Sequence, residues 1–86
     1  MQSGFEWDPA KADSNLEKHN IAFEDAATIF DDPYHFLVDV TKPEYGENRY
    51  RAIGRIYGGR LVAVVYTNRE ERRRIISARK ARKNEQ

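Results

Sequence analysis

The sequence predicts an α+β fold in which two amino-terminal helices pack on one face of an antiparallel β-meander. Up to Phe30 the apolar residues recur at helical spacing, whereas after Pro33 they alternate with polar residues, as strands do. Short turn signals, such as Gly58-Gly59, join the later apolar runs. With 86 residues, the chain forms one domain, 1–86, that buries roughly 60–65% of its unfolded surface.

The amino-terminal elements have clear start and stop signals. Phe5-Glu6-Trp7 alternates as a short edge strand does. Asp8 is a suitable N-cap and Pro9 a suitable first helical residue, and the helix is expected to end near Asn20. A second helix is predicted over 23–30, because Phe23, Ala26, Ala27 and Phe30 share one face. Asp31-Asp32-Pro33 ends it.

Four strands are predicted after Pro33, at 36–40, 49–57, 61–66 and 75–78. The first is expected to be half-buried, because Phe36, Val38 and Val40 alternate with His35, Leu37 and Asp39. Residues 61–66 are almost wholly apolar, so this strand is expected at the centre of the sheet. Because hairpins connect neighbouring strands, the strand order should follow the sequence.

The charge is divided between the two halves of the chain. Residues 1–48 hold three Lys+Arg and eleven Asp+Glu, whereas residues 49–86 hold twelve Lys+Arg and three Glu. One interpretation is that the halves neutralise each other across the fold. The other is a functional basic surface. If the helices cover the Tyr50/Ala52/Ile56 side of one strand, its other side and the basic tail 79–86 form a single positive surface suited to phosphates.

Several classes of protein are disfavoured. The chain has no cysteine, its acids show no metal-ligand spacing, and no apolar run approaches the roughly 20 residues that span a bilayer. Met1-Gln2-Ser3-Gly4 does not resemble a secretion signal. We therefore expect a cytoplasmic protein without metal or cofactor.

Motifs along nearly the whole chain resemble the BrnT-like toxins. They are Phe5-Glu6-Trp7-Asp8-Pro9, Lys11, Asn15-Leu16-Glu17-Lys18-His19, Phe23-Glu24-Asp25-Ala26, Phe30-Asp31-Asp32-Pro33, Gly54-Arg55, residues 61–67, and Arg74-Ile75-Ile76-Ser77-Ala78-Arg79-Lys80-Ala81. The sequence departs from the family at Tyr66-Thr67, where relatives often have His-Thr, and it stops soon after the Ser-Ala-Arg motif.

The resemblance implies a ribonuclease of RelE-like fold from a type II toxin–antitoxin system. Its partners would be an RNA substrate and a neighbouring-gene antitoxin with a DNA-binding domain, in a toxin–antitoxin hetero-oligomer. We expect this antitoxin to cover the basic face, or the cleft between it and the helices, with an acidic or aromatic segment.

Cleavage of RNA without a metal needs proton transfer and cations that neutralise the phosphate. Arg79 is the first candidate for the cation, because it lies where a stiff strand ends, within the family motif. Tyr66, His19 and Lys18 are candidates for proton transfer or charge stabilisation, and Arg69 is a second candidate cation. The residues assigned to backbone phosphates are Arg49, Arg51, Arg55, Arg74, Lys80, Arg82 and Lys83.

Each of these residues also has a simpler interpretation. Arg79 could be a solvated surface arginine, Tyr66 a core or base-stacking residue, and His19 a helix-end residue interacting with the last carbonyls. Two other functions use the same basic face: a non-catalytic nucleic-acid-binding module, and a protein that chiefly receives an acidic partner. The sequence alone does not separate binding from cutting.

Overall fold

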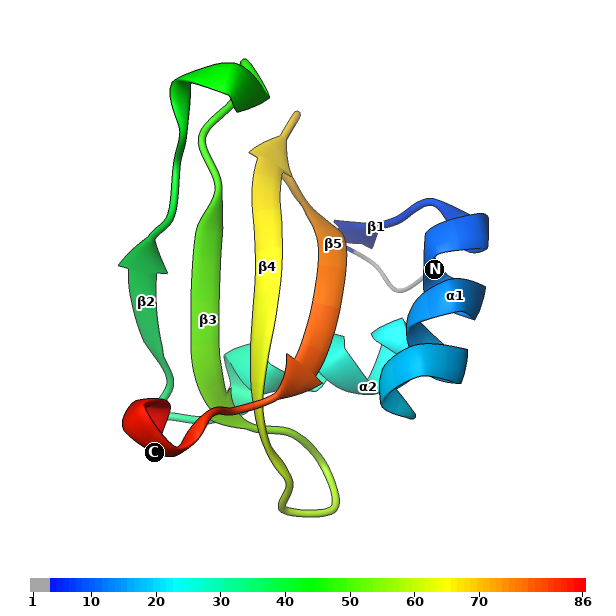
Figure 1. The fold of residues 1–86 in the computed structure, drawn as a ribbon, viewed down its shortest axis with the longest axis vertical. Helices are drawn as coiled ribbons and strands as arrows, with labels where there is room; N and C mark the ends of the chain where they lie inside the picture. The colour runs from blue at the N-terminus through cyan, green and yellow to red at the C-terminus, as the bar shows by residue number, and fades with distance from the viewer. Residues whose placement is uncertain (1–3) are drawn as a thin grey trace.

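The computed structural model describes residues 4–86, in which a five-stranded sheet is backed by helices on one face (Figure 1). The sheet order is β1-β5-β4-β3-β2. The strands are β1 (Phe5–Glu6), β2 (Phe36–Asp39), β3 (Tyr50–Arg55), β4 (Leu61–Arg69) and β5 (Arg72–Lys80). The expectation about a secretion signal concerned residues 1–4, and residues 1–3 lie outside the described residues.

The first helix, α1 (Pro9–His19), begins and ends as predicted. The Asp8 carboxylate accepts a hydrogen bond from the Ala10 N–H at 3.0 Å, and Asn20 ends the helix in the left-handed conformation, with φ of 57°. Within α1, the buried residue is Asn15. Its side chain faces the edge of β5 rather than water.

The predicted second helix is divided into α2 (Phe23–Ala26) and a 3-10 helix, Ala27–Asp31. The Thr28 hydroxyl donates to the Asp25 carbonyl at 2.6 Å, a local bond that competes with the regular α-helical ladder. The predicted core spacing is nevertheless correct for Phe23, Ala26 and Ala27, which are buried. These residues pack against the sheet side formed by Ala52, Val64 and Ala78, which confirms the face that the helices cover.

The meander from β2 to β5 has the predicted order, with β4 in the middle. Gly58 and Gly59 both have positive φ, 94° and 87°, at the β3–β4 turn, where side chains would be strained. The prediction of a purely antiparallel sheet is wrong, because β1 pairs parallel to β5. Both side chains of β1 hold it beside β5. The Phe5 ring lies 5.7 Å from the Phe30 ring on the helix side of the sheet, and Glu6 forms an ion pair with Arg74 on the opposite face.

The prediction that β2 is half-buried is also wrong. All four residues of β2 are exposed, because β2 forms the sheet edge and α2 and the 3-10 helix after it lie behind other strands (Figure 1). The predicted alternation is still present: Phe36 lies opposite Ile53, and Leu37 lies opposite Ala52, on the helix side. The pattern identified the strand but not its place in the sheet.

The basic tail predicted at 79–86 is partly strand and partly a folded turn. Strand β5 continues to Lys80, and residues 81–86 then fold back over the sheet face without helices, ending in a 3-10 turn, Lys83–Glu85 (Figure 1). Ala81 is buried there with Ile53 and Ala63. We call this side of the sheet, which carries Arg51, Ile53, Val65 and Arg79, the open face.

Candidate functional site

Ion pairs partly neutralise the predicted basic surface. Five arginines on or beside the open face lie within 4 Å of three glutamates. The pairs are Arg49–Glu47 at 2.9 Å, Arg69–Glu47 at 3.7 Å, Arg74–Glu6 at 2.7 Å, Arg79–Glu85 at 2.8 Å and Arg51–Glu85 at 3.7 Å. Glu6 and Glu47 come from the acidic half of the chain, so the neutralisation of one half by the other is realised at these two positions.

The guanidinium of Arg79 is held by Glu85. Its two terminal nitrogens donate to the two carboxylate oxygens at 2.8 and 3.0 Å, the bidentate geometry that arginine forms with carboxylates. These bonds lower the pKa of Glu85 to about 2, and the Arg82 N–H and Arg51 contribute in the same direction. Arg79 is therefore bound within the protein, and its side chain is only 21% exposed.

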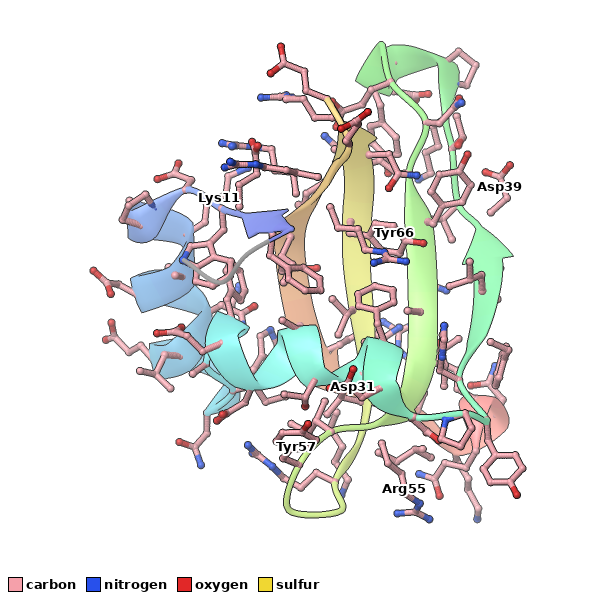
Figure 2. The ribbon with its side chains drawn as sticks, turned by 180° about the vertical axis from the view of Figure 1, so that it is seen from behind. Lys11, Asp31, Asp39, Arg55, Tyr57 and Tyr66 are labelled. Carbon is pink, nitrogen blue, oxygen red and sulfur yellow. The ribbon has the colours of Figure 1, made fainter. Side chains whose placement is uncertain are left out.

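Tyr66 lies on the helix side of the sheet (Figure 2) and is 3% exposed. Its ring packs edge-on against Phe30 at 5.1 Å and beside Tyr50 at 5.8 Å. Burial raises the pKa of the Tyr66 hydroxyl, although Arg73 opposes this shift. This environment fits a core residue better than a base. Arg73, which the sequence analysis did not single out, lies 4.1 Å over the Phe30 ring.

His19 and Lys18 lie beside β5 because Asn15 ties α1 to this strand. The Asn15 amide accepts from the Ala78 N–H at 3.1 Å and donates to the Ala78 carbonyl at 2.9 Å, as a neighbouring strand would. The two elements enclose a pocket of about 200 Å³, which we call the α1–β5 pocket. Its lining residues are Lys11, Ser14, Asn15, Lys18, His19, Ile76 and Ser77.

A second pocket, of about 580 Å³, lies at the β3–β4 turn end of the sheet; we call it the hairpin pocket. It is lined by His19, Asn20, Ile21, Arg55, Arg60, Leu61, Val62, Lys80 and Gln86. This lining contains three cationic side chains and no acidic one. The Arg60 guanidinium donates to the Asn20 carbonyl at 2.9 Å, and Arg55 donates to the Gly59 carbonyl at 2.7 Å.

His19 lines both pockets, so the fold joins two sets of residues that are distant in the sequence. We call the set Lys11, Lys18, His19, Arg55, Arg60 and Lys80 the basic band. Among the residues that the structure describes, none of these side chains takes part in an ion pair. The positive charge of the lysines and arginines in this set is available to a ligand, unlike that of Arg79.

The sequence analysis missed two members of the basic band. Lys11 stands seven residues before Lys18, which is about two helical turns, so the spacing places both residues on one face of α1. Figure 2 labels Lys11 on this helix. Arg60 directly follows the Gly58-Gly59 turn, and only the fold brings it to the end of α1. Arg82 and Lys83, assigned to phosphates, are exposed on the carboxy-terminal segment.

Within residues 4–86, no three His, Asp or Glu side chains are grouped so that they could hold a metal ion. No helix in the described part of the chain is long and apolar enough to cross a membrane.

Comparisons with known proteins agree with this structure. Residues 7–85 match the family described as the ribonuclease toxin, BrnT, of type II toxin–antitoxin systems. The fold is similar to the 1.1 Å crystal structure of the Brucella abortus ribonuclease toxin BrnT, with a TM-score of 0.68 and 26% sequence identity. This similarity covers 90% of this chain and 94% of the Brucella chain. No curated protein matches the chain. Because the family match spans nearly all of the sequence, the chain belongs to the BrnT family of ribonuclease toxins of type II toxin–antitoxin systems.

Proposed function

We propose that the chain is an endoribonuclease that cuts RNA without a metal, by attack of a ribose 2′-hydroxyl on the adjacent phosphate, and that it does so at the basic band. The observation that carries this proposal is the position of His19, at the junction of two pockets with cationic linings. Histidine is the side chain best suited to exchange protons near neutral pH. Free cations on both sides of it can hold consecutive phosphates of one strand.

In the proposed mechanism, His19 removes the proton from the 2′-hydroxyl, whose oxygen then forms a bond to phosphorus. The bond from phosphorus to the 5′-oxygen breaks, and the Lys18 ammonium gives the leaving oxygen a proton. The products are a 2′,3′-cyclic phosphate and a 5′-hydroxyl, and solvent restores both side chains to their starting protonation states. Lys11 neutralises charge that develops on the phosphate, which needs a preorganised cation.

Roles for the other candidates follow from their partners. Lys80, Arg55 and Arg60 line the hairpin pocket and bind phosphates flanking the cut. Arg79 supports the site by fixing the carboxy-terminal segment through Glu85, and reaches RNA only when that bond opens. Tyr66 is a core residue in this proposal, and Arg49, Arg51, Arg69 and Arg74 contribute weakly because each is paired.

The proposal includes the cellular setting that the family implies. We infer that the toxin adopts the RelE-like fold, acts in the cytoplasm, and is neutralised by an antitoxin. This antitoxin carries a DNA-binding domain and joins the toxin in a hetero-oligomer. Purified toxin–antitoxin complex should bind its own operator DNA, whereas the toxin alone should not. Specific operator binding by the toxin alone would remove the DNA-binding role from the antitoxin.

The test of cleavage compares His19→Ala with Lys42→Ala, a control truncation of another exposed polar side chain in a loop outside the basic band. His19→Ala should lower the cleavage rate at saturating RNA by about 10²–10⁴-fold, with RNA affinity changed only a few-fold. Lys42→Ala should cut like the parent, and the parent should remain active in excess EDTA. Cleavage by His19→Ala at the parental rate would refute the role of His19.

One alternative stays open because binding and cutting use the same surface. A parent protein that binds RNA through the basic band and never cuts it would be a non-catalytic binding module. The measurement is end-labelled RNA incubated with toxin freed from antitoxin, in which the cyclic phosphate product distinguishes cleavage by 2′-hydroxyl attack from hydrolysis by a contaminating nuclease.

A further inference from the structure

The edge strand β2 exposes an unusual concentration of large apolar side chains. Among the described residues, six large hydrophobic side chains are exposed, and four of them lie within 34–38. Tyr34 is 87% exposed, Phe36 49%, Leu37 52% and Val38 38%. Large apolar side chains exposed together along one short segment are typical of an interaction site.

The backbone of β2 is also free on its outer side. Strand β2 pairs with β3 alone, at the end of the sheet. The Val40 N–H bonds to the Arg49 carbonyl at 3.0 Å, and antiparallel ladders alternate inward and outward groups. The N–H and C=O groups of Leu37 and Asp39 therefore point away from β3. Edge strands are usually protected by Lys, Pro or a bulge, but 36–38 has none of these.

The side chains beside this edge favour an apolar strand with a slot for one of its residues. Phe36, Ile53 and Leu61 line a pocket of about 160 Å³ on the open face, next to the edge. A strand added to β2 would place alternate side chains against Phe36 and Val38 on this face and against Leu37 on the other.

Charge decides which partner fits. The segment 31–47 carries five acidic residues and one basic residue, Lys42, and Asp39 lies within β2 itself (Figure 2). A second copy paired edge to edge would bring two such acidic segments together, which repulsion disfavours. A partner strand that alternates apolar residues with Lys or Arg would be attracted to the same edge.

We propose that the antitoxin docks by adding an extended segment, apolar and flanked by Lys or Arg, to the outer edge of β2. The proposal depends on the antitoxin partner inferred above, but not on catalysis at His19. It assigns the anchoring contact to the apolar edge, separate from the basic face that an acidic segment was expected to cover.

The direct test is amide hydrogen exchange of the toxin, alone and in complex with the purified product of the neighbouring antitoxin gene. The Leu37 and Asp39 amides should exchange fast in free toxin and become protected by at least about tenfold in the complex. Unchanged exchange at both amides in a saturated complex would overturn the proposal. Protection in concentrated toxin alone would instead indicate pairing between two copies.

Variants supply an independent readout. Leu37→Pro removes an outward N–H without removing a bond to β3, and proline is tolerated on edge strands. Phe36→Lys removes apolar contact and adds charge, and Leu16→Lys is its matched control, since Leu16 is 46% exposed on α1. Both β2 variants should bind antitoxin about 10–100-fold more weakly and still cut RNA at the parental rate, whereas Leu16→Lys should bind normally. Normal binding by both β2 variants, with their folds verified, would exclude the edge.

If the toxin proves not to cut RNA, the exchange and affinity measurements still decide this proposal. If it cuts RNA but β2 stays unprotected, only the docking surface is wrong.

Discussion

The bond between Glu85 and Arg79 predicts a specific pH dependence of stability. The pKa of Glu85 falls from its ordinary value of 4.5 to about 2 in the folded protein. A difference of this size corresponds to at most about 3 kcal/mol of the free energy of unfolding at neutral pH. We expect about 1–2 kcal/mol, because the side chains of Arg79 and Arg51 remain 21% and 30% exposed and water weakens the interaction.

The sign follows from the lowered pKa. The stabilisation is fully present above pH 4.5, where the unfolded carboxyl is also ionised, and it is lost as the pH falls toward 2. Glu85→Gln should therefore lower Tm by about 4–15 °C at pH 7. The difference between the variant and the parent should shrink steadily below pH 4.5.

The assay is urea denaturation of the parent, Glu85→Gln and Glu44→Gln at several pH values between 7 and 2.5. Glu44 is an exposed glutamate that forms no ion pair within the described residues, so its variant should match the parent throughout. If the difference in stability between Glu85→Gln and the parent stays constant down to pH 2.5, the reasoning about Glu85 is refuted. The same variant frees Arg79, and tighter RNA binding with a steeper salt dependence would show that Arg79 can reach phosphate.

Three further predictions concern packing and charge. Asn15→Leu should lower the free energy of unfolding by about 2–4 kcal/mol, measured in urea, because the Ala78 N–H and C=O lose their buried partner. Gly54→Ala should lower the free energy of unfolding by about 1–3 kcal/mol, seen as a lower Tm in a thermal melt, because a Cβ there would lie 2.8 Å from His35 Cβ. The RNA affinity should fall steeply between 50 and 200 mM salt, and Lys18→Ala should reduce the slope of log K against log salt by about one.

Arg79 illustrates what the sequence could and could not provide. Its strand and its basic surroundings were predictable, because Ile75, Ile76 and Ala78 form a short apolar run and the positive charges follow it. Its partner was not predictable, because Glu85 reaches it only when residues 81–86 turn back over Ile53 and Ala63. Arg79→Ala would leave the Glu85 carboxylate without its bidentate partner, so we expect this substitution to lower stability as well as to remove a positive charge.

The same division between local and long-range information explains the other differences. Caps, turns and the faces of β3 depend on neighbouring residues, so Asp8, Gly58 and Ala52 behave as predicted. The parallel pairing of β1 and the exposure of β2 depend on which elements lie beside them. Asn15 shows the consequence for the site: its two bonds to Ala78, a residue 63 positions away in the sequence, replace a neighbouring strand and position His19.

The α1–β5 pocket and strand β2 lie at opposite edges of the sheet, although Arg55 of the basic band lies on β3, next to β2. Strands β5 and β2 are separated by β4 and β3, three spacings of about 4.8 Å, and the α1–β5 pocket lies beyond β5. A strand added to β2 therefore cannot itself fill the pocket at His19.

Neutralisation by simple occlusion requires the antitoxin to continue from β2 across the open face, over about 14 Å or more, which needs at least about four or five extended residues. Such a segment would pass Arg51 and Arg79, where acidic side chains could compete with Glu85. An apolar, basic strand followed by an acidic segment thus reconciles docking at β2 with the acidic contact expected from the charge of the second half of the chain.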